Sequence, residues 1–301
     1  MTKPGNKNWQ WLLAGIFFAI LWPSASTATK VGLTTAQPLV IALVRFALAS
    51  SILLLIAYGF QKQRLPKKDE WKQIALYGFL NITVYLGCYV IAMQNITAGI
   101  GSLAVAINPV FISFLSVFFL KEKLTIPVLT AILVCTIGVV CASWPLFSSA
   151  TVTVSGLLIL LFSMLSYSAG AIYFSSKSWN GLSLIAINGW QTLLGGLFLL
   201  PVMITLYKSN QNHLTAKFWL SASWLAIPVS IVAVQLWMWL LSINPVRAGL
   251  WLFLCPLFGF IIAAWWMGDK IDSFTVVGVL LVITGLLLSK INAKKSQVVF
   301  D

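Results

Sequence analysis

The sequence predicts an all-α membrane protein, with ten transmembrane helices arranged as two inverted five-helix repeats around a central cavity. The first observation behind this prediction is composition. Of the 301 residues, 60% are hydrophobic and only 8% are charged, and the mean hydropathy is +0.96. Soluble domains carry about a quarter charged residues, so a soluble enzyme, a nucleic-acid-binding protein and a disordered chain are excluded. The other two observations are the number of long apolar runs and an internal repeat.

Ten apolar runs follow one another with short connections, and each is close to the 20 or so residues that a bilayer crossing requires. They cover residues 9–29, 38–58, 72–94, 98–120, 126–145, 154–174, 182–206, 217–241, 246–267 and 273–290. The eighth and ninth runs are the least clearly separated. Asn244, Pro245 and Arg247 supply the turn and helix-start signals between them.

The first run has features of a cleavable signal peptide. Lys3 and Lys7 precede it, and Ser26-Thr27-Ala28 would suit a signal peptidase. We expect an uncleaved first helix instead, because cleavage would leave nine spans and would break the repeat described below.

The distribution of Lys and Arg predicts that both termini lie in the cytoplasm. With the N-terminus inside, 14 of the 19 basic residues fall in inside segments and 4 fall in outside segments, while Arg45 lies within a span. Cytoplasmic loops of membrane proteins carry such an excess. An odd number of spans would place one terminus outside and weaken the bias.

A gapless repeat appears when the chain is shifted by 147 positions. The matched pairs are Pro109 and Pro256, Phe111 and Phe258, Glu122 and Asp269, Lys123 and Lys270, Leu124 and Ile271, Leu133 and Leu280, and Gly138 and Gly285. The two halves, residues 9–145 and 154–290, would each hold five spans. Because five is odd, the second half must cross the bilayer in the opposite sense. Inverted repeats are common in secondary transporters and also occur in channels, so the repeat favours transport.

Arg45 is the only formal charge well inside a span. A central arginine costs roughly 2.5–3.5 kcal/mol on insertion scales. It follows the outer start of its helix by about seven residues, which places it about 10 Å deep. Two interpretations are open: Arg45 faces the cavity and attracts a carboxylate or other anion, or it bonds backbone carbonyls and neighbouring polar groups or extends outward.

Polar and aromatic side chains in the spans supply further candidates for a cavity lining. In the third span, Tyr77, Asn81, Tyr85 and Tyr89 recur every four residues and so share one helical face. The predicted substrate-binding residues are Trp22, Arg45, Asn81, Tyr85, Tyr89, Asn108, Tyr167, Gln191, Gln235 and Trp239. Taken singly, each uncharged candidate outside the third span suits a helix–helix contact better, but together these residues can form an uncharged, aromatic-rich cavity.

Several kinds of chemistry lack the residues that they need. There is no Walker motif for ATP, a single His (His213), and four cysteines without metal-ligand spacing. We therefore expect no cofactor, no bound metal and no enzymatic reaction. Proton-coupled carriers commonly use a carboxylate or His within the membrane. None is expected within these spans, so facilitated diffusion or exchange is predicted rather than tight proton coupling.

At this point the chain resembles the EamA type of the ten-helix drug/metabolite transporter superfamily. The resemblance covers nearly the whole chain and is carried by Leu21-Trp22, Arg45-Phe46, Pro109, Leu120-Lys121-Glu122-Lys123-Leu124, Pro256 and Met267-Gly268-Asp269-Lys270-Ile271. The family's usual Gly-Glu pair is Lys121-Glu122 in the first half and Gly268-Asp269 in the second. The resemblance implies export or uptake of small metabolites, often amino acids, in a bacterial cytoplasmic membrane.

The leading hypothesis is a secondary transporter of amino acids or related small solutes, with the lipid bilayer and a small-molecule substrate as its partners and no nucleic acid. Sugars, nucleosides and amphipathic drugs are alternative substrates for aromatic surfaces. A channel and a membrane-embedded enzyme are more remote alternatives, the latter because clustered His or carboxylates are missing. These residues do not fix the substrate, the direction of flux or the oligomeric state.

Overall fold

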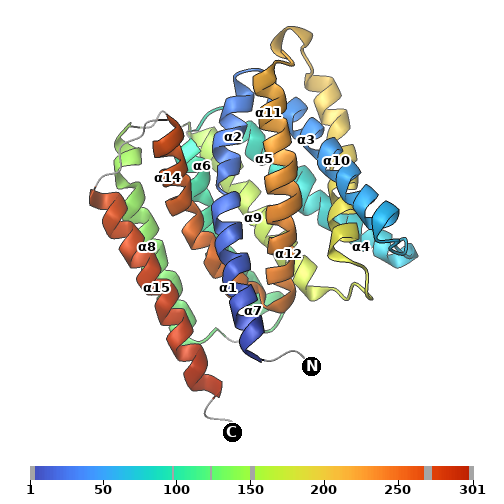
Figure 1. The fold of residues 1–301 in the computed structure, drawn as a ribbon. Coiled ribbons are helices and arrows are strands. Elements are labelled where there is room, and N and C mark those ends of the chain that lie inside the picture. Colours follow the sequence, from blue (N-terminus) through green and yellow to red (C-terminus); the bar gives the residue numbers. More distant parts are fainter. Residues whose placement is uncertain (1–3, 97, 123, 150–152, 268–272, 298–301) are drawn as a thin grey trace.

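The computed structural model describes residues 4–96, 98–122, 124–149, 153–267 and 273–297, and every regular element within them is a helix (Figure 1). The first half contains α1 (Pro4–Leu21), α2 (Ser24–Leu33), α3 (Pro38–Leu54), η1 (Leu55–Phe60), α4 (Lys68–Gly78), η2 (Phe79–Val84), α5 (Tyr85–Ala92), α6 (Ala98–Ala104), η3 (Val105–Ile107), α7 (Asn108–Phe119) and α8 (Ile126–Ser149). The second half contains α9 (Val154–Ser176), α10 (Leu184–Leu206), η4 (Ser209–Gln211), α11 (Ala216–Trp224), η5 (Leu225–Ala233), α12 (Val234–Ile243), α13 (Pro245–Leu250), η6 (Trp251–Leu254), α14 (Cys255–Met267) and α15 (Ser273–Gln297).

Apolar helices occupy the positions of all ten predicted spans. Within the described residues, seven helices are long and apolar enough to cross a membrane. Three shorter apolar helices, Val105–Phe119, Ile126–Gly138 and Val276–Gly285, lie at the fourth, fifth and tenth predicted spans. The complete helices α8 and α15 run for 24 and 25 residues, or about 36 Å at 1.5 Å per residue. Of the repeat pairs, Lys123, Asp269, Lys270 and Ile271 lie outside the described residues.

Prolines divide several spans into shorter helices. The first predicted span, 9–29, extends to Leu33, and a turn at Trp22 and Pro23 separates its two helices. A proline removes a backbone hydrogen bond and crowds the preceding turn. The short 3₁₀ segments η3 and η6 end two residues before Pro109 and Pro256, respectively. The 147-residue shift relates these two positions.

The packing of α8 against α15 shows the two-fold relation between the halves directly. The Cys135 thiol lies 3.5 Å from the carbonyl oxygen of Val282, which is its own counterpart 147 residues later. A Cβ added at Gly138 would lie 2.8 Å from the Gly278 carbonyl, and one added at Gly285 would lie 3.0 Å from the Ala131 carbonyl. Because Ala131 and Gly278 are also related by the shift, the two contacts are two-fold equivalents of each other. The two helices therefore cross at a pseudo-two-fold axis.

The remaining helices exchange partners in the same way. The first crossing, α1–α2, packs on α11, α12 and α14, whereas its counterpart α9 packs on α5 and α7. Helix α3 packs on its own counterpart α10, and Figure 1 shows both this pair and the α8–α15 pair side by side. The described chain begins and ends at one end of the bundle, which we call the termini end. The α10–α11 connection marks the opposite or far end (Figure 1).

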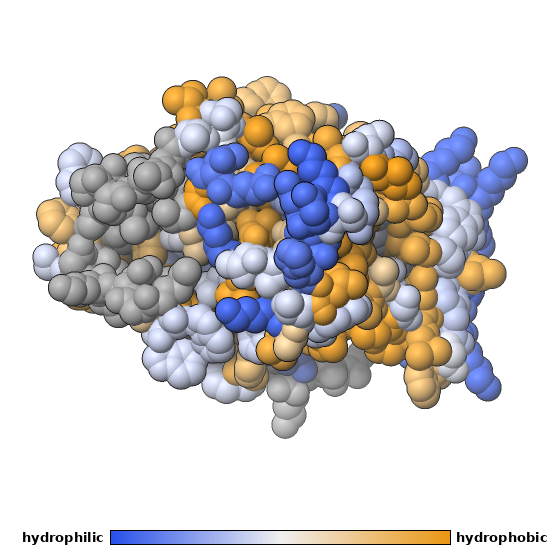
Figure 2. Space-filling model, turned by 90° about the horizontal axis from the view of Figure 1, so that it is seen from above, coloured by the Kyte–Doolittle hydropathy of each residue, from blue (hydrophilic) through white to orange (hydrophobic). Residues whose placement is uncertain are grey.

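The surface has the distribution expected of a protein in a bilayer. Large apolar side chains such as Phe114, Phe118, Trp265 and Trp266 are exposed on the flanks. Figure 2 looks onto the far end, where hydrophilic residues gather and apolar ones surround them. Exposed polar residues there include Lys208 and Asn210 of the α10–α11 connection.

Candidate functional site

A small cavity lies between α2 with the turn before it, α3, α5, η3 and η5. Its lining is Trp22, Pro23, Ala25, Ser26, Arg45, Tyr85, Leu86, Tyr89, Val105 and Val229. The Pro23 turn exposes part of this lining by interrupting the first helix. The volume open to the centre of a water molecule is only about 10 Å³, roughly what one buried water needs. The cavity is therefore closed around its lining in this conformation, and a larger ligand requires the helices to separate.

Arg45 brings an unbalanced positive charge to this cavity. Its side chain is 2% exposed, and its Nε donates to the hydroxyl of Ser230 across 2.7 Å. Among the described residues the two terminal nitrogens make no hydrogen bond, although a guanidinium carries five N–H donors. The one ion pair within the described residues joins Arg64 and Glu70, far from Arg45 in the chain. One nitrogen thus has a structural partner, and the other two are available for the anion that the first interpretation requires.

Hydroxyl groups complete the polar side of the cavity. The Tyr89 hydroxyl lies 2.8 Å from the Ser26 hydroxyl, which also accepts a hydrogen bond from Ser102 across 3.1 Å. The Tyr85 hydroxyl makes no hydrogen bond to any described residue, yet Tyr85 lines the cavity. It is therefore a second available donor beside Arg45.

Aromatic rings form the opposite side of the same region. The ring centroid of Tyr167 lies 4.7 Å from that of Tyr85, 5.7 Å from that of Trp22 and 5.7 Å from that of Trp237. Trp237 in turn stacks on Phe18 at 5.0 Å. We call Phe18, Trp22, Tyr85, Tyr167 and Trp237 the aromatic wall. It joins helices of both halves, and two of its members, Trp22 and Tyr85, also line the cavity.

Amide side chains connect Arg45 to the second half of the chain. Asn81 donates to Gln191 across 3.2 Å, and Gln191 donates to Asn188 across 3.1 Å. Asn188 donates to the backbone carbonyl of Ser230 across 3.0 Å, the residue whose hydroxyl accepts from Arg45. These buried groups satisfy one another, so this network fixes the position of Arg45 rather than offering groups to a ligand.

The structure separates the predicted site residues into three groups. Trp22, Arg45, Tyr85 and Tyr89 line the cavity. Tyr167, Asn81 and Gln191 lie next to it, in the aromatic wall or in the amide network. The remaining three, Asn108, Gln235 and Trp239, lie outside the cavity lining.

Asn108, Gln235 and Trp239 are placed at helix contacts outside the cavity lining. Asn108 accepts a hydrogen bond from Ser168 across 3.1 Å and so joins α7 to α9. The Trp239 ring lies 6.2 Å from that of Trp11, near the termini end of α12 and α1. The carbonyl oxygen of Gln235 is buried and has no hydrogen-bond partner among the described residues.

Sequence reasoning missed Ser230 and Trp237. Ser230 is the one hydroxyl in the run Leu225–Ala233, and such a lone residue is typical of simple helix packing. That run is a π-helix, and a matching π segment, Phe79–Val84, contains Asn81. Wide π turns inside helices often occur at functional sites. Hydropathy does not signal them.

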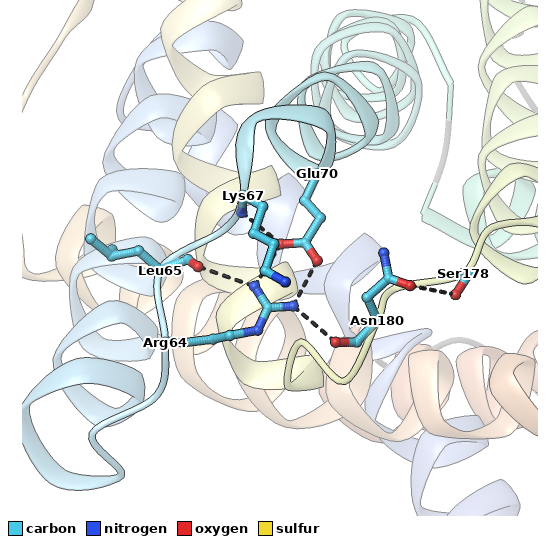
Figure 3. Close-up of polar contacts among 6 residues, drawn as sticks. All are labelled: Arg64, Leu65, Lys67, Glu70, Ser178 and Asn180. Carbon is cyan, nitrogen blue, oxygen red and sulfur yellow. Dashed lines mark hydrogen bonds and ion pairs between the residues drawn. The ribbon is translucent and has the colours of Figure 1, made fainter.

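Polar contacts tie together the connections at both ends of the bundle. At the termini end, Arg64 donates to the Glu70 carboxylate across 2.6 and 2.7 Å and to the Asn180 carbonyl across 2.9 Å (Figure 3). The Glu70 carboxylate raises the pKa of Arg64. At the far end, Gln37 accepts from the backbone of Lys208 across 2.7 Å and from the side chain of Asn212 across 2.9 Å. Both ends of the α3–α10 pair are thus joined, which agrees with the closed cavity.

The sequence was also compared with known proteins. The profile of the EamA-like transporter family matches residues 9–144 and again 154–291. Similar curated proteins include Protein PecM of Dickeya dadantii, which is 26% identical over 273 residues, covering 89% of this chain and 88% of that protein. The uncharacterized transporter YvbV of Bacillus subtilis is 25% identical, with 93% of this chain and 92% of that protein covered.

A third relative carries a substrate class in its name. The probable terminal-alkyne amino-acid exporter of Streptantibioticus cattleyicolor is 26% identical over 280 residues, covering 91% of each chain. A solved protein crystal structure shares the fold, with a TM-score of 0.75 at 16% identity, covering 94% of this chain and 98% of the other. With the family profile matched along both halves, the chain belongs to the EamA-like transporter family.

Proposed function

We propose that this protein is a secondary transporter of small metabolites that bear a carboxylate, namely amino acids or related solutes. It moves them by alternating access without ATP, as an exporter or exchanger. The observation that carries the substrate class is the cavity-lining guanidinium of Arg45, which keeps available donors and has no acidic partner among the described residues. Membership of a transporter family supplies the coarser activity.

The chemistry of Arg45 favours a carboxylate ligand. Guanidinium and carboxylate form two parallel, charge-assisted hydrogen bonds. An unpaired buried charge lowers stability by several kcal/mol, so its presence is most easily explained by a ligand that balances it. The amino-acid exporter among the relatives supports the same class of substrate.

The membrane and its orientation are part of the proposal. The relatives named above come from bacteria, and the distribution of Lys and Arg favours cytoplasmic termini. On this assignment the cavity lies in the outer half of the bilayer, because Arg45 follows the far-end N-cap residue Gln37 by eight positions.

Exchange or facilitated diffusion is the proposed mode. The cavity lining contains Arg45 and tyrosines as its titratable groups, and no carboxylate or histidine. Glu122, just beyond α7, has a pKa raised by burial, but it does not line the cavity. Uptake into proteoliposomes should therefore change little when a proton gradient is imposed at a fixed substrate gradient. A steep rise would contradict this mode.

Counterflow in proteoliposomes tests the transport activity. A labelled amino-acid and carboxylate panel is measured with wild type, Arg45→Gln and Arg45→Lys, each checked for monodispersity and correct insertion. We expect saturable exchange of one class, lost in Arg45→Gln and partly kept in Arg45→Lys. Unchanged exchange in Arg45→Gln would refute the role of Arg45, and exchange of uncharged sugars or nucleosides alone would refute the substrate class.

A further inference from the structure

Resting on the proposed function, we infer that the cavity selects its ligand by net charge: it takes an organic monoanion with an aromatic or apolar body in preference to a zwitterion of the same shape. The carboxylate would bind Arg45 and Tyr85, and the body would lie against the aromatic wall. This narrows the proposed carboxylate substrates to monoanions and places zwitterionic amino acids second.

The charge of the cavity is the first step. Its lining holds one cation, Arg45, and no acidic residue. The acidic residues that the structure describes are Asp69 and Glu70, in the first turn of α4, and Glu122, on the α7–α8 connection. All lie at or near the termini end, and Glu70 is bonded to Arg64. A bound monoanion therefore cancels the local charge, whereas a zwitterion leaves it at plus one.

The hydrogen-bonding groups point the same way. The groups left available in the lining are the terminal nitrogens of Arg45, which only donate, and the hydroxyl of Tyr85, which can donate or accept. The hydroxyls of Ser26 and Tyr89 are already paired with each other. An ammonium group needs acceptors or an anion nearby. In an amino acid it would also lie only a few ångströms from the guanidinium, where like charges repel strongly in a dry site.

The aromatic wall supplies a surface for the rest of the ligand. Rings of this kind attract aromatic and aliphatic groups by area and by edge or stacked contacts. They also attract ammonium groups through their π faces, which is the strongest argument for a zwitterion. Here Arg45 occupies the same small cavity as Trp22 and Tyr85, so an ammonium drawn to those faces would approach a fixed positive charge.

Three ligands of one shape separate these possibilities: 3-phenylpropionate, phenylalanine and phenethylamine. Near about pH 7.5 they carry net charges of about minus one, zero and plus one. Binding is measured by isothermal titration calorimetry on the full chain in nanodiscs, which avoids passive permeation of the weak acid. We expect 3-phenylpropionate to bind at least about tenfold more tightly than phenylalanine, and phenethylamine to bind weakest.

Variants of Arg45 identify the source of the preference. In Arg45→Gln the ratio between 3-phenylpropionate and phenylalanine should fall toward one. In Arg45→Lys, which keeps the charge, the preference should persist, and this result remains informative if Arg45→Gln does not fold. Equal or tighter binding of phenylalanine to wild type would overturn the inference while leaving a carboxylate transporter intact.

The failure of the inference and that of the proposed function are distinguishable. If none of the three ligands binds but the counterflow panel shows exchange of another carboxylate, the inferred aromatic monoanion is wrong and the transporter proposal stands. If neither binding nor counterflow of any carboxylate is found in a correctly folded protein, both are wrong.

Discussion

Arg45 and Gln191 stand at the same distance from the start of their helices but have different surroundings. Each comes eight residues after the N-cap residue of its helix, Gln37 for α3 and Ser183 for α10. Each also bonds a residue in a π segment of the other half. Arg45 bonds Ser230 in η5, and Gln191 bonds Asn81 in η2.

The difference lies in how many donors and acceptors are used. Gln191 accepts from Asn81 and donates to Asn188, and its nitrogen also lies 3.9 Å from the Met238 sulfur. Arg45 uses one donor of five. The amide of Gln191 is thus fully hydrogen-bonded, as expected of a structural residue, whereas Arg45 keeps the free donors that the proposed binding role requires.

Replacing Arg45 with glutamine, the residue at position 191, should have the largest effect. Arg45→Gln removes the charge–ligand interaction, so affinity for the carboxylate substrate should fall by about 2–5 kcal/mol, measured by counterflow and calorimetry. The melting temperature in detergent should hold or rise, because an unbalanced buried charge is removed. A drop in melting temperature with unchanged affinity would show that Arg45 is the structural member of the pair.

Replacing Gln191, whose amide is fully hydrogen-bonded, should lower stability and leave substrate preference unchanged. Gln191→Leu leaves the Asn81 amide without its partner and removes one of the hydrogen bonds of Asn188, which keeps its bonds to Ser230 and Thr192. A buried group left without a partner costs about 1–3 kcal/mol. We expect a lower melting temperature and a lower folded yield, but a preserved preference among substrates per folded molecule. Thr192→Val on the same helix, which loses a bond of 3.4 Å, is the matched control and should change stability much less.

A smaller effect is expected at Tyr85. Tyr85→Phe removes a hydroxyl that has no partner among the described residues, so stability should stay nearly constant while affinity falls by about 1.5 kcal/mol. Tyr167→Phe is the matched control, since the Tyr167 hydroxyl is also unpartnered but Tyr167 does not line the cavity. Equal affinity losses in both variants would argue against a donor role for Tyr85.

The smallest effect on substrate binding is expected at the termini end. Arg64→Gln removes the pair with Glu70 and the bond to the Asn180 carbonyl. Arg64 is 35% exposed, but the Glu70 side chain is only 2% exposed, so the variant leaves a buried carboxylate without its charged partner. Thermal unfolding should show a lower melting temperature, with substrate preference unaltered. A changed preference would extend the binding region beyond the cavity.

The sequence predicted the ten spans because burial in lipid demands long apolar runs, and it predicted the inverted repeat because proline and glycine positions recur. It also brought out Trp22, Arg45, Tyr85 and Tyr89, since polar groups are conspicuous in apolar runs. Ser230 escaped because its partner Arg45 is 185 residues away. Helical spacing predicts a face of one helix, not which distant helix meets it.

The break at Pro23 illustrates the same limit. Transmembrane helices tolerate proline when neighbours satisfy the freed backbone groups, so the residue alone did not predict a turn. Asn108, Gln235 and Trp239 look as polar or aromatic in sequence as the cavity residues do. Their placement depends on helix rotation and on contacts such as that between Asn108 and Ser168.

The two-fold equivalent contacts of Gly138 and Gly285 have a consequence for how such a bundle can be assembled. A surface that packs on its own counterpart is self-complementary, so two copies of a half-length polypeptide inserted in opposite orientations could already have formed this bundle. Such a homodimer, however, would carry the same residue at both equivalent positions. A site with a single arginine therefore requires two halves that differ in sequence, and a chain that contains both halves always supplies them together.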